Sequence, residues 1–119
     1  METDETTLQK LTIADEAYIE SVLAGASARP ASSPLDRKTH ALVRIAALIA
    51  IDAPSASYID ATECARAAGA SDEELVGCLF AVLPTLGAPR VVSAAPKLGL
   101  ALGYDVVAAL EEPTRASSA

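Results

Sequence analysis

Residues 41–51, ALVRIAALIAI, constrain this chain more than any other stretch, because Arg44 is their single charged member. They form the second half of a helix expected over residues 34–51, and this half is apolar on every side. A helix that is apolar all round is normally buried on all sides. A chain of 119 residues makes one domain with few helices to surround it. We therefore expect other copies of the chain to cover part of this helix in a homo-oligomer.

The rest of the pattern predicts an all-α protein, a compact bundle of about six helices. No segment alternates apolar and polar residues as a half-buried strand does. Hydrophobic residues make up 51% of the chain and aromatic residues only 3%, so Ala, Leu, Val and Ile must fill the core. We expect one helical domain over residues 13–112, between flexible ends at 1–12 and 113–119. The expected helices cover residues 13–23, 34–51, 54–69, 71–83, 88–102 and 104–111.

Four local signals fix the expected helix ends. Ser33 occupies an N-cap position before Pro34, and Ser71 with Glu74 forms a capping box. Gly69 is a good left-handed terminator. Proline inside a helix removes a hydrogen bond, so we expect Pro84 to end one helix and Pro96 to kink or split the next.

Charge and cysteine content exclude several classes of partner and site. Nine basic and sixteen acidic residues give a net charge of −7, which argues against nucleic acid and anionic membrane surfaces as partners. The longest apolar run is too short to span a bilayer, and the first ten residues lack the basic start and apolar core of a signal peptide. Two cysteines and one histidine suggest neither a disulfide framework nor a metal site. We expect a cytoplasmic protein without a cofactor.

Three segments of the chain resemble the carboxymuconolactone decarboxylase family, which includes the alkylhydroperoxidase D-like proteins. They are LDRKTHALVRIAALIA at 35–50, AAGASDEELVGCL at 67–79 and TLGAPRVVSAA at 85–95. The resemblance covers residues 35–102. It implies a compact, alkylhydroperoxidase D-like helical fold that assembles into trimers, hexamers or similar rings.

The chain departs from this family at the residues that carry its redox chemistry. Peroxidatic members have Cys-x-x-Cys and a His four residues later, and these would fall at Pro54, Ser57 and Ala61. The family's upstream Glu would fall at Ala41. None of the four expected residues is present, so the resemblance implies a scaffold and an assembly rather than the dithiol site.

His40, Arg44 and Glu63 are the candidates for acid–base chemistry. His40 is the only histidine, and Arg44 lies one turn later on the same face of the expected helix. An Arg in so apolar a helix needs a carboxylate, a carbonyl or an anionic ligand, and Glu63 or Asp60 could be its partner. In the functional interpretation His40 is the acid or base, Arg44 holds a substrate carboxylate and Glu63 orients Arg44. The alternative is a structural ion pair beside a solvated His40.

Four further residues have a functional and a structural interpretation. Cys64 and Cys78 could act together only if tertiary packing brings them close, with Cys64 the weak redox candidate; otherwise both are small core residues. Arg90 could share an anion with backbone N–H groups after the Gly-Ala-Pro turn, or be solvated. Tyr58 could line a substrate pocket, or pack in the core or an interface.

Three functional hypotheses follow. The first is a carboxymuconolactone decarboxylase-like lyase that performs acid–base chemistry on a small organic carboxylate or lactone. The second is a non-catalytic oligomeric binding or accessory protein on the same scaffold. The third is a thiol-dependent alkylhydroperoxidase, which would require Cys64 or Cys78.

Overall fold

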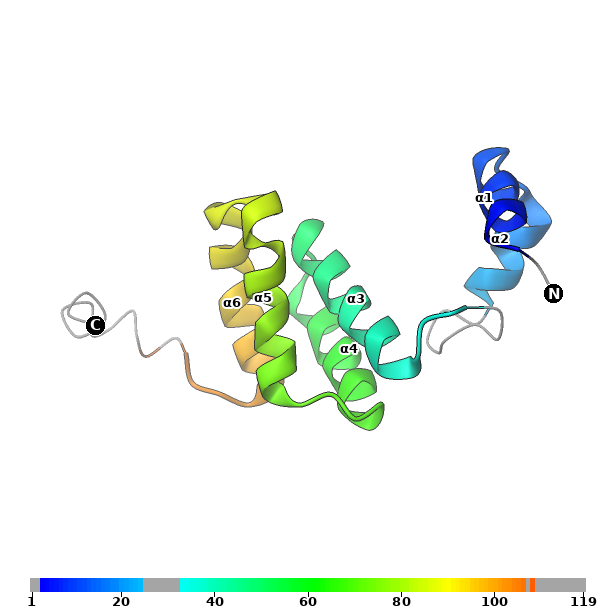
Figure 1. Ribbon diagram of the computed structural model, residues 1–119. Helices are drawn as coiled ribbons and strands as arrows, with labels where there is room; N and C mark the ends of the chain where they lie inside the picture. Colours follow the sequence, from blue (N-terminus) through cyan, green and yellow to red (C-terminus); the bar gives the residue numbers. More distant parts are fainter. Residues whose placement is uncertain (1–2, 25–32, 107, 109–119) are drawn as a thin grey trace. The chain divides into compact units, whose positions relative to one another are not determined.

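The computed structural model describes residues 3–24, 33–106 and 108, and these residues form six helices and no strand (Figure 1). The predicted all-α class and helix number are confirmed. The chain divides into two units, Met1–Arg37 and Lys38–Ala119. Among the described residues, no helix combines the length and apolar character that crossing a membrane requires.

The first unit is a pair of short helices, α1 (Asp4–Thr12) and α2 (Glu16–Leu23). The sequence predicted a flexible end here, but the hydroxyl of Thr3 accepts a hydrogen bond from the Thr6 N–H and caps α1, which begins with two acidic residues. The carboxylate of Asp15 caps α2 in the same way, so this helix begins three residues later than predicted. Neither helix contains a buried residue.

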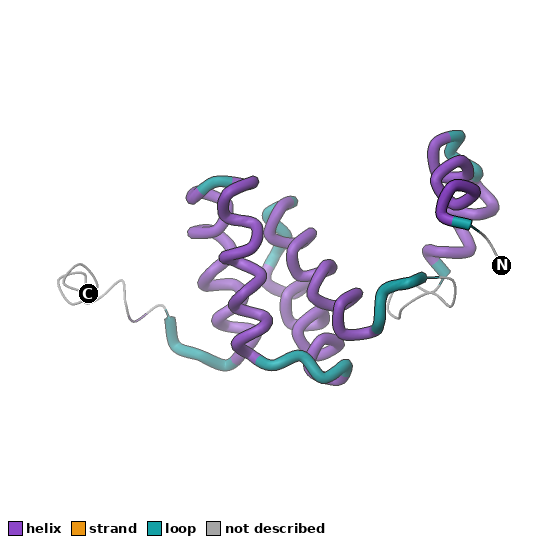
Figure 2. The backbone as a smooth tube through the Cα atoms, in the orientation of Figure 1, coloured by secondary structure: helices purple, strands orange, loops and turns teal. Residues whose placement is uncertain are grey.

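The second unit contains four helices, which run in alternating directions (Figure 2). Helices α4 and α5 both pack against α6. Helix α3 is joined to α4 by an ion pair and to α5 by an ion pair and a thiol–carbonyl contact. The helices are α3 (Arg37–Ala50), α4 (Ser55–Ala67), α5 (Asp72–Leu86) and α6 (Ala88–Leu102).

Two of the predicted helix-end signals are present, but the N-cap predicted at Ser33 is wrong, because α3 begins at Arg37 and the Ser33 hydroxyl accepts a hydrogen bond from the nearer Leu35 N–H. Gly69 and Gly103 terminate α4 and α6 in left-handed conformations, and the capping box at Ser71 is present. Two helices end the same way at residues other than glycine, α1 at Ala14 with φ of 55° and α3 at Asp52 with φ of 54°. The Asp52 N–H donates to the carbonyl of Ile49, and the next N–H donates to that of Leu48, the Schellman pattern that usually has Gly at this position.

The two internal prolines do not end or split their helices, so the predicted end at Pro84 and the predicted split at Pro96 are wrong, while a kink at Pro96 stays a prediction. Helix α5 continues through Pro84 to its C-cap at Gly87, and α6 is continuous through Pro96. Both prolines are exposed, so the carbonyls they leave unbonded lie on the solvent side of each helix, where water can serve them. Residues 104–106 are not helical, and most of the predicted helix at 104–111 lies outside the described residues.

The core is built from small and aliphatic side chains, as the composition predicted. Helix α3 contributes a single buried stripe, whereas Val43 and Ile51 from the same apolar run are 53% and 71% exposed. The sequence-based expectation that α3 is buried on all sides is therefore not met within the unit. Tyr58 is the largest fully buried side chain. The remaining buried core includes Ala41, Ile45, Ile49, Ala61, Ala65, Leu75, Ala94 and Leu98.

Tyr58 provides the first test of this core. Its hydroxyl is buried and has no hydrogen-bond partner among the described residues. A buried unsatisfied polar group costs about 1–3 kcal/mol, so we expect Tyr58→Phe to raise the free energy of unfolding by about 1 kcal/mol in urea denaturation. Leu75→Ala, a cavity control, should lower it by about 2–5 kcal/mol. A Tyr58→Phe variant less stable than the wild type would contradict this description of the core.

Candidate functional site

Arg44 lies half-way along α3 and forms an ion pair with Asp60 of α4. Its Nη2 donates to Oδ2 of Asp60 over 2.8 Å, and the two side chains are 33% and 63% exposed. The hydrogen bond to Asp60 raises the pKa of the Arg44 guanidinium, burial lowers it, and the nearby thiol of Cys64 raises it further. Arg44, Asp60 and Cys64 therefore form one cluster between α3 and α4.

The other acid–base candidates have different positions. His40 is half-buried on α3, one turn before Arg44. Glu63 is exposed on α4, and the carboxylate that orients Arg44 belongs to Asp60. Of the two partners considered from the sequence, Asp60 is the one used.

Tyr58 and Cys78 belong to the core. Tyr58 has no exposed surface, and burial raises the pKa of its phenol. The thiol of Cys78 lies 3.6 Å from the carbonyls of Leu42 and Glu74, and burial raises its pKa also. Both cysteines are free thiols, with Cys64 half-buried. Cys78 is therefore the small core residue of the structural interpretation.

Arg90 lies in a separate cluster around Asp52, which sequence reasoning missed. Asp52 accepts hydrogen bonds from Ser93 Oγ at 2.7 Å and Lys97 Nζ at 3.0 Å, and Arg90 Nη1 lies 3.6 Å from it. Lys97 also donates to the carbonyl of Ala53. The hydrogen bond from Ser93, then that from Lys97, lowers the pKa of Asp52. Arg90, Ser93 and Lys97 are spaced so that they share one face of α6, and this spacing was the sequence signal that could have predicted the cluster.

A second cluster, also missed, surrounds Asp72 at the start of α5. Arg66 donates to both carboxylate oxygens of Asp72, at 2.9 and 3.0 Å, and to the carbonyl of Leu102. The Tyr104 hydroxyl donates to the same carboxylate over 2.6 Å. The hydrogen bond from Tyr104, followed by that from Arg66, lowers the pKa of Asp72. This cluster joins α4, α5 and the segment after α6.

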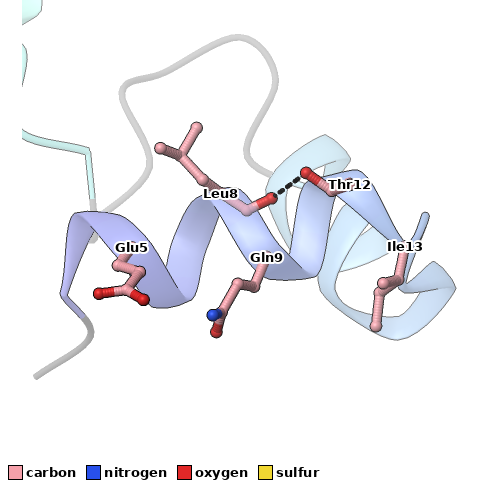
Figure 3. Close-up of a pocket in the computed structure, with 5 residues that line it drawn as sticks. All are labelled: Glu5, Leu8, Gln9, Thr12 and Ile13. Carbon is pink, nitrogen blue, oxygen red and sulfur yellow. Dashed lines mark hydrogen bonds between the residues drawn. The ribbon is translucent and has the colours of Figure 1, made fainter.

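The surface hollows lined by described residues include three, and none of these three is lined by His40, Arg44 or Cys64. One of about 430 Å³ lies along α1 and the turn after it, so it has a single wall (Figure 3). A groove of about 330 Å³ lies between α3 and α5, with Val43, Ala46, Gly77 and Ala81 among its lining residues. A third, of about 440 Å³, lies beside α5 and is lined by Asp72, Glu73, Val76, Gly77, Phe80 and Tyr104.

The described residues contain no group of three or more His, Cys, Asp or Glu side chains that could hold a metal ion. Comparisons with protein-family models, with curated proteins and with solved structures found no match to this chain. The resemblance to the carboxymuconolactone decarboxylase family therefore stays a prediction from the sequence.

The Asp52 cluster predicts how stability depends on pH. Because the folded-state pKa of Asp52 is lowered, its contribution is present above the unfolded-state value of about 3.9 and is lost as the pH falls through the folded-state pKa. The carboxyls of Asp72 and Glu74 have lowered pKa values and act in the same direction. We expect the free energy of unfolding to fall between about pH 5 and pH 2.

Chemical denaturation across this pH range measures the effect. Asp52→Asn should be less stable at pH 7 and should lose less stability on acidification than the wild type. Equal pH dependence in the two proteins would show that the cluster does not contribute.

Proposed function

We propose that this protein is a carboxymuconolactone decarboxylase-like protein with an alkylhydroperoxidase D-like fold. In this proposal it forms a homo-oligomer, a trimer or hexamer, and performs acid–base chemistry on a small organic carboxylate or lactone. The observation that supports the proposal is the environment of Arg44. Arg44 is a cation on an otherwise apolar stretch of helix, and its carboxylate partner, Asp60, is 63% exposed.

A comparison with Arg66 supports a ligand-binding role for Arg44. Arg66 holds both oxygens of Asp72 and a backbone carbonyl, an arrangement that fixes the guanidinium completely. Arg44 makes one hydrogen bond to its carboxylate. A ligand carboxylate can share this guanidinium with Asp60 or replace it, because Arg binds carboxylates in a bidentate geometry and an exposed Asp is readily resolvated.

The remaining roles follow from position. His40, one turn from Arg44 and half-buried, is the acid or base for proton transfer, since an imidazole can both accept and donate a proton. Asp60 orients Arg44, the role first assigned to Glu63. Tyr58 is fully buried and Arg90 belongs to the Asp52 cluster, so neither takes part in this site.

The carboxylate site is tested by titrating the protein with a panel of small carboxylates and lactones, followed by NMR. We expect Arg44→Gln to weaken carboxylate binding at least tenfold, because a charge-assisted hydrogen bond contributes about 1.5–3 kcal/mol. Arg90→Gln is the matched control and should bind as the wild type does. Wild-type affinity in Arg44→Gln would remove Arg44 from the site.

Turnover of the bound compounds tests His40 separately. His40→Ala should retain binding and lose turnover, with little change in melting temperature. Full activity in this variant would exclude His40 from the mechanism.

A non-catalytic oligomeric binding or accessory protein on the same scaffold is the second candidate. The exposed apolar face of α5, where Phe80 is 72% exposed, favours it. Assembly without turnover of any compound in the panel would support this candidate over the first.

A thiol-dependent alkylhydroperoxidase is the third candidate, favoured only by the position of the half-buried Cys64 beside Arg44. Peroxide turnover that persists when Cys64 and Cys78 are both replaced by Ser would exclude it.

A further inference from the structure

Gly77 lies in the middle of α5, where neither its backbone conformation nor its surroundings within the described chain require a glycine. Glycine inside a helix costs about 0.5–1 kcal/mol relative to alanine. A Cβ built at Gly77 meets no atom within 4 Å, so alanine would fit. Gly99 differs, because a Cβ there would lie 2.7 Å from Cγ2 of Val106. The other described glycines, Gly69, Gly87 and Gly103, have positive φ.

The surface around Gly77 has the form of a helix-packing site. Gly77 lines both the groove between α3 and α5 and the hollow beside Tyr104. Phe80, less than one turn further along α5, is 72% exposed. A large exposed ring and a surface depression therefore lie three residues apart on one helix.

We propose that a second copy of this chain packs its α5 antiparallel against this α5, with the helices crossing at Gly77. Phe80 of each copy enters the depression beside Gly77 of the other. This inference rests on the homo-oligomer of the proposed function and specifies the contact within it. A two-fold contact pairs one surface with itself, so a single helix that carries both the ring and the depression satisfies both sides. The absence of a side chain at Gly77 lets the two backbones approach closely.

The charges on α5 are compatible with this pairing. Residues 75–86 carry no charge, and the acidic residues of α5 all lie in its first turn. Asp72 is neutralised by Arg66 and Glu74 by Lys38. In an antiparallel crossing at Gly77 the two copies of Glu73 lie about 12 Å apart along the axis, beyond the Debye length of about 8 Å. A parallel pairing would place them together, so charge selects the antiparallel arrangement.

The area available fits a small but specific interface. A buried aromatic side chain removes roughly 150–250 Å² from water. The contact would bury two Phe80 rings and the walls that receive them. It would also cover the neighbouring Val43 and Leu83, which are 53% and 38% exposed. Together these surfaces give a buried area on the order of 1,000 Å². This lies at the low end of specific interfaces, so we expect micromolar dissociation. The contact occurs in dimers and in hexamers that have two-fold axes, but not in a simple trimer.

The test compares sedimentation equilibrium of the full chain with that of three variants over micromolar concentrations. The wild type should self-associate. Gly77→Ala should melt at a higher temperature when dilute, because the helix is more stable, and yet dissociate at least tenfold more readily. Phe80→Ser should also weaken association at least tenfold. Val92→Ser, which removes a 69%-exposed apolar side chain from α6, should associate as the wild type does.

Two outcomes would overturn the inference in different ways. Wild-type association in Gly77→Ala and Phe80→Ser would show that the contact lies elsewhere, while the proposed homo-oligomer would stand. A wild-type chain that stays monomeric would remove both the contact and the proposed assembly, without touching carboxylate binding at Arg44. If Phe80→Ser does not fold, Gly77→Ala still decides the question, because it strengthens the helix.

Discussion

Close packing between α4 and α6 is the constraint on which the four-helix unit depends. The buried faces of these helices consist largely of small residues, with Ala61, Ala65 and Ala94 at 1% exposure or less. Such faces allow the two backbones to lie close together, but they remove little apolar area per residue from water. Several larger apolar side chains outside this contact lie at the periphery of the unit. Val43 of α3, Ile51 in the turn after it and Phe80 of α5 are each more than half exposed.

Polar clusters hold the ends of these helices in register. One connects the turn after α3 to α6 through Asp52, and the other connects α4, α5 and the end of α6 through Asp72. Surface ion pairs contribute little stability individually, but hydrogen bonds from several elements to one carboxylate restrict how those elements can move. The Arg44–Asp60 pair differs because it lies in the middle of two helices, with a thiol beside it.

Local signals in the sequence predicted most of the helices but little of the candidate site. The capping box at Ser71 and the glycine terminator at Gly69 depend only on neighbouring residues, so both could be read directly. The helix at Asp4–Thr12 was missed because its Thr3 cap lies in a polar segment without apolar periodicity. Long-range pairs such as Asp52 with Ser93 depend on tertiary packing, which a single sequence does not reveal.

The difference between local signals and tertiary packing also explains why the sequence predicted a carboxylate partner for Arg44 without identifying which one. The need for a carboxylate followed from its apolar surroundings, but the choice between Asp60 and Glu63 depended on the rotation of α4. Both carboxylates are exposed on α4, and Asp60 is the one that accepts a hydrogen bond from Arg44.

The stability of an Ala94→Leu variant tests the packing of α4 against α6 most directly. Ala94 is fully buried, so the added atoms have no space, and overpacking of this kind costs about 1–3 kcal/mol. Ala56→Leu, on the exposed side of α4, should leave the free energy of unfolding nearly unchanged. A loss of stability at position 94 alone is the predicted result. An Ala94→Leu protein as stable as the wild type in urea denaturation would contradict the account.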